Sequence, residues 1–89
     1  MSERLPVFET APLIEQWIGR DRSLSMAVIE VVASISNTRI ESQPPLYDAM
    51  DPDLLDGSFA RSGTGLIAFP YNGYIVSVSG DRTVAVYEG

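Results

Sequence analysis

Three side-chain types are missing from this chain of 89 residues, and each absence excludes a kind of chemistry. Without cysteine, the chain has no disulfide framework, no thiolate nucleophile and no thiolate metal site. Without histidine, the commonest general base and metal ligand is missing. Without lysine, neither a Schiff base nor a phosphate-loop lysine can form. These absences predict a protein that binds a partner and is not an enzyme, with no catalytic residue, no metal and no cofactor.

Positive charge is also scarce, because six basic residues, all arginines, stand against twelve Asp and Glu, and the formal net charge is −6. Two interpretations are open: an acidic domain that binds a partner, or adaptation to a cytoplasm loaded with salt. At ~1 M salt the Debye length falls to about 3 Å, so self-repulsion on an acidic surface is screened. The missing lysine favours salt adaptation, because carboxylates help solubility more than lysine does.

Nucleic acid is a poor partner for such a surface, because phosphate binding needs clustered cations and weakens in salt. Direct contact with DNA would need an arginine cluster that only the fold could create. The arginines available for such a cluster are Arg4, Arg20, Arg22 and Arg39.

Long apolar runs are absent too, although 45% of the residues are hydrophobic. No run approaches the length that crosses a bilayer, and the first residues lack the basic and apolar regions of a secretory signal. The hydrophobic fraction is ordinary for a globular protein, and the length suits one small domain. We therefore expect one domain in the cytoplasm, with no membrane contact.

The clearest predicted element is a helix over residues 24–36, with Ser23 or Ser25 as its N-cap. Its polar positions form one narrow stripe, which indicates a mostly buried helix. Its many β-branched residues make a strand the competing interpretation, and the length and the stripe decide for a helix. The apolar residues that cover the helix are Met26, Val28, Ile29, Val31, Val32 and Ile35.

A proline-rich and acidic block follows. Pro45 can open one helical turn that runs through Met50. Asp51 fits the N-cap of a second helix, with Pro52 at its first position and an acidic first turn that meets the positive end of the helix dipole. Gly57 either ends this helix or weakens it. The residues that we expect to supply its buried face are Leu54, Leu55 and Phe59.

The last third predicts a β-meander. Asn72-Gly73 is a strong signal for a two-residue hairpin turn. A three-residue loop, 80–82, then leads to a last strand over 83–87, although this loop type prefers glycine where the chain has Arg82. The strand pairs that these turns predict are Tyr71–Tyr74, Phe69–Val76, Ile67–Val78, Val78–Val84 and Val76–Val86.

The N-terminal region gives a weaker signal. Pro6 and Pro12 break any early helix, and residues 13–18 favour a short edge strand over a helical turn. The elements together predict an α+β fold of two helices followed by a three-stranded antiparallel β-meander, with the longer helix packed on one sheet face. We expect residues 1–22 to be a partly ordered segment that can add an N-terminal edge strand, and residues 23–89 to form the single small α+β domain.

The order of these motifs resembles one family, the halobacterial output domain family, the first of the haloarchaeal output domain types. The residues that carry the resemblance are the helix Ala27–Ala33, the motif Pro44–Tyr47, the acidic run Asp51–Asp56, Phe59, and the hairpin Tyr71–Tyr74 followed by alternating valines. Pro44–Tyr47 together with the acidic run is the most specific part.

The resemblance covers about residues 23–87 and implies a haloarchaeal origin and a role in signal transduction. Members of the family stand alone or are attached to signalling modules such as receivers, and no catalytic residue comes with the resemblance. Arg82 departs from the family pattern, in which glycine is common.

Four carboxylates in the acidic block, at positions 48, 51, 53 and 56, suggest a cation site. The EF-hand pattern fails, because Leu55 stands at its fifth position and Gly57 falls one place late. Helix capping and a solvated acidic face are the preferred interpretation. The Ser62–Gly65 segment is interpreted as a loop, because it precedes a strand, whereas phosphate-binding loops open onto a helix.

The block is also the expected interaction surface. We call it the Pro-Tyr-Asp surface, and it consists of Pro44, Pro45, Tyr47, Asp48, Asp51, Asp53 and Asp56. Tyr47 is the aromatic ring most readily placed against a partner, whereas Phe69, Tyr71 and Tyr74 fit a core better than a platform for nucleic-acid bases.

The sequence predicts a non-enzymatic output or interaction module that docks onto a receiver, a kinase or a copy of itself, which includes a homodimer. The alternative is a small-ligand sensor with a pocket between the first helix and the sheet.

Overall fold

The computed structural model of the protein describes residues 11–89, so Arg4 and Pro6 lie outside the described part of the chain. Its main elements, in chain order, are β1 (Ile14–Trp17), α2 (Leu24–Ser36), α3 (Pro52–Leu54), α4 (Ala60–Ser62), β2 (Leu66–Tyr71), β3 (Tyr74–Ser79) and β4 (Thr83–Glu88). The 3₁₀ turns are η1 (Ile40–Ser42) and η2 (Leu46–Asp48), and η3 (Leu55–Phe59) is a π-helical turn. None of the helices in this range combines the length and the apolar character needed to cross a bilayer.

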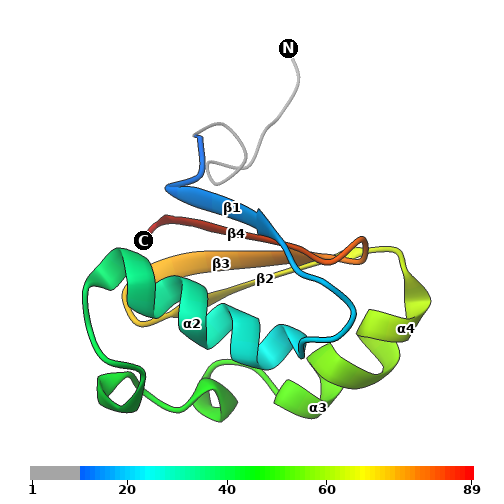
Figure 1. Ribbon diagram of the computed structural model, residues 1–89, viewed down its shortest axis with the longest axis horizontal. Helices are drawn as coiled ribbons and strands as arrows, with labels where there is room; N and C mark the ends of the chain where they lie inside the picture. Colours follow the sequence, from blue (N-terminus) through cyan, green and yellow to red (C-terminus); the bar gives the residue numbers. More distant parts are fainter. Residues whose placement is uncertain (1–10) are drawn as a thin grey trace.

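The strands form one antiparallel sheet in the order β1-β4-β3-β2, and the helical elements lie on one of its faces (Figure 1). The predicted α+β fold and its meander are confirmed. The N-terminal edge strand is also present, because β1 pairs with β4 from Ile14 opposite Val86 to Trp17 opposite Thr83. The sheet therefore includes residues ahead of position 23.

The β2–β3 hairpin turns at the predicted residues. Asn72 has a φ of 51° and Gly73 a φ of 84°, both in the left-handed region that a type I′ turn requires. The twist of that turn matches the twist of the strands, which fixes the register. The predicted pairs found in the sheet are Tyr71–Tyr74, Phe69–Val76, Ile67–Val78, Val78–Val84 and Val76–Val86.

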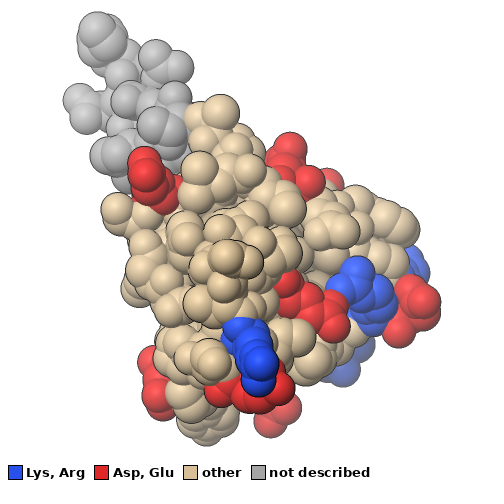
Figure 2. Space-filling model, turned by 60° about the vertical axis from the view of Figure 1, so that its left-hand side comes forward, with Lys and Arg blue, Asp and Glu red and all other residues tan. Residues whose placement is uncertain are grey.

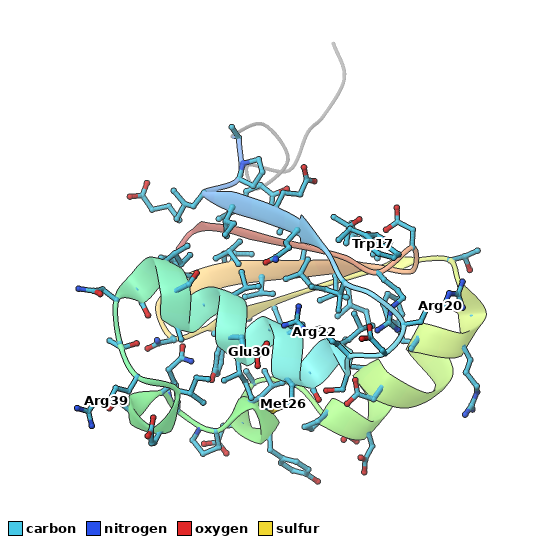
Figure 3. The ribbon with its side chains drawn as sticks, in the orientation of Figure 1. Trp17, Arg20, Arg22, Met26, Glu30 and Arg39 are labelled. Atoms are coloured by element: carbon cyan, nitrogen blue, oxygen red, sulfur yellow. The ribbon has the colours of Figure 1, made fainter. Side chains whose placement is uncertain are left out.

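Helix α2 has the predicted bounds and packs its valines on the sheet. The Ser23 Oγ accepts a hydrogen bond from the Met26 backbone N–H at 3.1 Å, and Asn37 ends the helix with a φ of 58°. The fully buried core side chains are Ile18, Leu24, Leu55, Val28, Val32, Val76, Val78, Val84 and Val86. Met26 was expected in the core but is 47% exposed, because it lies on the helix face turned away from the sheet (Figure 3).

The second helical region does not end at Gly57. That residue leaves helical geometry, with a φ of −100° and a ψ of −106°, and the chain kinks there and continues through α4 to Gly63. Leu55 is fully buried under α2, as expected, and Phe59 is half-buried, but Leu54 is 46% exposed and its expected burial was wrong. Consecutive residues of a helix point in directions about 100° apart, so Leu55 faces the core while Leu54 faces solvent.

The β3–β4 loop places a non-glycine residue in the left-handed region. Arg82 has a φ of 75°, and its backbone N–H donates to the Ser79 carbonyl at 2.9 Å. The three-residue loop has the geometry that the strand pairing demands, and the arginine adopts the conformation that glycine usually supplies. Gly80 in the same loop touches the chain after α4, because a Cβ there would lie 2.3 Å from the Thr64 nitrogen.

Candidate functional site

All seven residues of the Pro-Tyr-Asp surface are exposed, and the fold places them along the connection from α2 to η3. Pro44, Pro45 and Asp48 line a pocket of about 310 Å³ against the β2–β3 turn, where Tyr71 and Asn72 complete the lining. Tyr47 stands beside this pocket and is 71% exposed. The structure thus brings the first half of the predicted surface together with the hairpin tip.

The backbone under this surface is held by contacts from three directions. Leu46 is buried in the core, next to the exposed Tyr47. The Tyr71 hydroxyl donates to the Pro44 carbonyl at 2.7 Å, and the Asn72 side-chain amide donates to Gln43 Oε1 at 3.1 Å. Gln43 itself donates to the Ile29 carbonyl at 2.9 Å, which connects the loop to α2. These contacts fix the backbone of the loop that carries the exposed Tyr47 ring.

Burial raises the pKa of Tyr71 above its ordinary value of 10.0, because the charged phenolate would lose solvation. The hydroxyl therefore stays protonated at neutral pH and keeps its hydrogen bond to the loop. The Tyr71 ring is buried in the core, as expected, and its hydroxyl anchors the loop at Pro44.

The carboxylates of the acidic block take separate structural positions. Asp51 caps α3, with its Oδ1 accepting from the Asp53 backbone N–H at 3.0 Å, as predicted. Asp56 accepts from the Ser25 backbone N–H at 3.0 Å and from the Ser25 hydroxyl at 2.5 Å, so it caps α2 from outside the helix. Within residues 11–89 no three His, Cys, Asp or Glu side chains come together in a way that could hold a metal ion.

Acidic side chains are spread over the molecular surface, with basic groups beside some of them (Figure 2). Arg22 forms an ion pair with Glu30 on α2, whereas Arg39 lies at the far end of the molecule from Arg20 (Figure 3). The arginines considered for DNA contact therefore do not gather into one cluster among the described residues. Arg20 instead joins a different group.

That group lines a second pocket of about 310 Å³, at the opposite end of β3. Trp17, Arg20, Arg61, Asp81 and Arg82 are among its lining residues. The pocket was not predicted from the sequence. The available signal was that the only tryptophan ends a short edge strand and two arginines follow within five residues.

The interface between α2 and the sheet is filled by side chains. Val28 and Val32 of the helix meet Val76, Val78 and Val84 of the sheet in the core, and none of these five exposes any surface. Both pockets described above lie outside this interface.

These observations define a class: a small α+β domain whose sheet is covered on one face by helices and whose anchored loop carries an exposed aromatic ring. The chain belongs to the family Halobacterial output domain 1, which it matches over residues 20–88. The predicted resemblance is confirmed, and the family indicates a signalling role in halobacteria. No curated protein and no solved structure matches the chain.

Proposed function

We propose that the chain is a non-enzymatic output module that docks onto another signalling protein in the haloarchaeal cytoplasm, through the Pro-Tyr-Asp surface. The observation that carries this proposal is Tyr47, 71% exposed on a loop anchored by Leu46 and Tyr71. A large ring on a fixed backbone loses little conformational entropy on binding, which suits the anchor of a protein contact.

The chemistry of the surface describes the partner. Asp48, Asp51 and Asp53 are all exposed around the Tyr47 loop. A matching partner carries a pocket for the ring and a basic rim for the carboxylates, as a face of a receiver or a kinase could supply. At ~1 M salt the Debye length is about 3 Å, so only carboxylates in direct contact contribute, and apolar contact carries most of the affinity.

Non-enzymatic action is supported by the chemistry that the chain lacks. Histidine, cysteine and lysine are absent from the sequence, and the carboxylates of the acidic block are exposed and serve partly as caps. The alternative of a ligand pocket between α2 and the sheet has less support, because valine side chains fill that interface.

Affinity capture from haloarchaeal lysate in molar KCl tests the proposal when matched baits are compared. Tyr47→Ala removes the exposed ring, and Leu66→Ala removes another exposed apolar side chain from β2 as the control. We expect receivers or kinases to be retained by the wild type and by Leu66→Ala, and lost with Tyr47→Ala. Binding is then measured directly between the purified pair.

A second pair of variants tests the carboxylates. Asp53→Asn changes the surface, and Glu15→Gln on β1 removes the same charge elsewhere. Asp56 is left unchanged, because it caps α2. If Tyr47→Ala retains the same proteins as the wild type, the Pro-Tyr-Asp surface is not the docking site. If the chain retains only itself, self-association replaces the receiver or kinase as the contact.

A further inference from the structure

Half of the arginines in the sequence line the second pocket. Of six arginines in the sequence, Arg20, Arg61 and Arg82 line the second pocket, where Asp81 is the one carboxylate among the described lining residues. On a chain with a net charge of −6, this makes a locally positive concavity on an acidic protein. Such a reversal of sign attracts and orients an anion.

Two of these arginines have exposed side chains. Arg20 and Arg61 are exposed, and neither forms an ion pair or a side-chain hydrogen bond within the described residues. Arg82 differs, because its guanidinium donates to the carbonyls of Ile18, Gly19 and Arg22. Its charge is therefore fixed beside the pocket, while Arg20 and Arg61 can close on a ligand.

The only tryptophan forms one wall of the pocket. Trp17 ends β1 and is 63% exposed, although tryptophan is highly buried on average. Its indole N–H donates to the Asp81 carbonyl at 3.0 Å, which fixes the ring. Figure 3 shows Trp17 and Arg20 at the same end of the molecule. A fixed and exposed indole face is a platform on which a planar ring can stack.

The carboxylate in the lining has a defined role. Asp81 Oδ1 accepts from the Ser79 hydroxyl at 2.5 Å and from the Thr83 backbone N–H at 3.1 Å, and these bonds lower the pKa of Asp81. A hydrogen bond from the Thr83 side chain also lowers this pKa. An ionised carboxylate in the same lining as three arginines suits a ligand that carries hydroxyl or amino donors as well as negative charge.

We propose that this pocket binds a mononucleotide, with its base stacked on Trp17 and its phosphate held by Arg20 and Arg61. Guanidinium groups match phosphate oxygens in pairs, and a ribose hydroxyl or base amino group meets the Asp81 carboxylate. A volume of about 310 Å³ is at the small end of ligand pockets, which suits one nucleotide and not a long strand. The proposal does not rest on the docking surface, because none of the residues of that surface lines this pocket.

Because the chain has one tryptophan, its fluorescence reports on the pocket directly. The purified full chain is titrated in molar KCl with adenosine, guanosine, cytidine and uridine 5′-monophosphates. We expect at least one of them to quench the fluorescence along a saturable curve. Absence of quenching by all four, together with no gain in thermal stability, overturns the proposal.

Charge variants locate the site. Arg20→Gln and Arg61→Gln each remove one charge-assisted contact, and we expect each to weaken binding by about tenfold. Arg39→Gln removes the same charge at the other end of the molecule and is expected to bind as the wild type does (Figure 3). If the three variants weaken binding equally, the pocket is not the site. All three residues are exposed, and far-ultraviolet circular dichroism verifies that the variants fold.

Three further measurements decide the ligand class. Trp17→Leu is measured by calorimetry, because its fluorescence is lost, and we expect nucleotide binding to fall at least about tenfold with the loss of stacking. Inorganic phosphate that competes as well as the nucleotide would overturn the base-stacking part. A single-stranded oligonucleotide that binds more tightly than any mononucleotide would overturn the assignment in favour of a nucleic-acid interface.

Discussion

Replacing Arg82 tests how this fold tolerates an arginine where glycine is expected. The residue combines an unfavourable backbone, with a φ of 75°, and a guanidinium that donates to three carbonyls of the β1–α2 connection. Arg82→Ala removes the side-chain bonds and keeps the strain. Arg82→Gly removes both, so the difference between the two variants measures the strain less the extra entropy that glycine gives the unfolded chain.

The expected change in the free energy of unfolding follows from the hydrogen bonds and from the backbone strain. A hydrogen bond to a charged group contributes about 1.5–3 kcal/mol, and here two of the three bonds share one nitrogen and the side chain is half-buried. We therefore expect Arg82→Ala to lower the free energy of unfolding by roughly 2–4 kcal/mol. Left-handed geometry costs about 1 kcal/mol for a non-glycine residue. The free energy of unfolding should therefore fall by about 1 kcal/mol less in Arg82→Gly than in Arg82→Ala.

The assay is equilibrium unfolding by urea in molar KCl, followed by circular dichroism and by the fluorescence of Trp17. The expected order of midpoints is wild type, then Arg82→Gly, then Arg82→Ala. Arg39→Ala is the control, and surface changes of this kind usually stay within about 0.5 kcal/mol. A glycine variant as stable as the wild type would refute the reasoning, because the three carbonyl contacts would then contribute no more than the strain that glycine relieves.

Three other changes have expected outcomes. Gly80→Ala forces a Cβ against the Thr64 backbone at 2.3 Å, and we expect a loss of about 1–3 kcal/mol by urea unfolding. Tyr71→Phe removes a hydrogen bond contributing about 1 kcal/mol at neutral pH. Because burial raises the folded pKa of Tyr71 above 10.0, wild-type stability is complete below pH 10.0 and falls as the pH rises through the folded value, and Tyr71→Phe should flatten that fall in unfolding curves. Asp56→Ala removes the cap on α2 at Ser25 and should cost about 1 kcal/mol by urea unfolding, with a loss of helical circular dichroism at intermediate urea.

Each of these outcomes has a control. Asp48→Ala removes an exposed carboxylate without a described hydrogen bond, so equal losses from the variants at positions 48 and 56 would contradict the capping role. Tyr47→Phe leaves the buried phenol of Tyr71 in place, so the free energy of unfolding of this variant should still fall above pH 10.0. If Gly80→Ala leaves the free energy of unfolding unchanged, the β3–β4 loop and the segment around Thr64 can move apart at no cost.

The parts of the fold that sequence could predict depend on local contacts. The register of the β2–β3 hairpin follows from Asn72-Gly73 and from strict alternation, both of which act within a few residues. The bounds of α2 follow from its Ser23 cap and its apolar stripe. The exposed loop around Tyr47 was likewise predictable, because prolines and acidic residues seldom enter a core.

The parts that sequence could not predict depend on distant contacts. The Arg82 conformation is stabilised by carbonyls up to 64 residues away, and Trp17 reaches the Asp81 carbonyl over the same separation. Asp56 caps a helix 31 residues before it, a role that no local pattern indicates. The helix continues past Gly57 because residues on both sides of it pack against the core. Local propensity is overridden by tertiary contact at each of these positions.

The strand order β1-β4-β3-β2 has a consequence for synthesis on the ribosome. Helix α2 and the β2–β3 hairpin can form from local contacts as they emerge, but the backbone partners of β1 are residues 83–86. Strand β1 must therefore wait for β4, and closing so long a loop is slow. Protection of the β1 amides against hydrogen exchange thus marks the moment at which β4 of a nascent chain has left the ribosome.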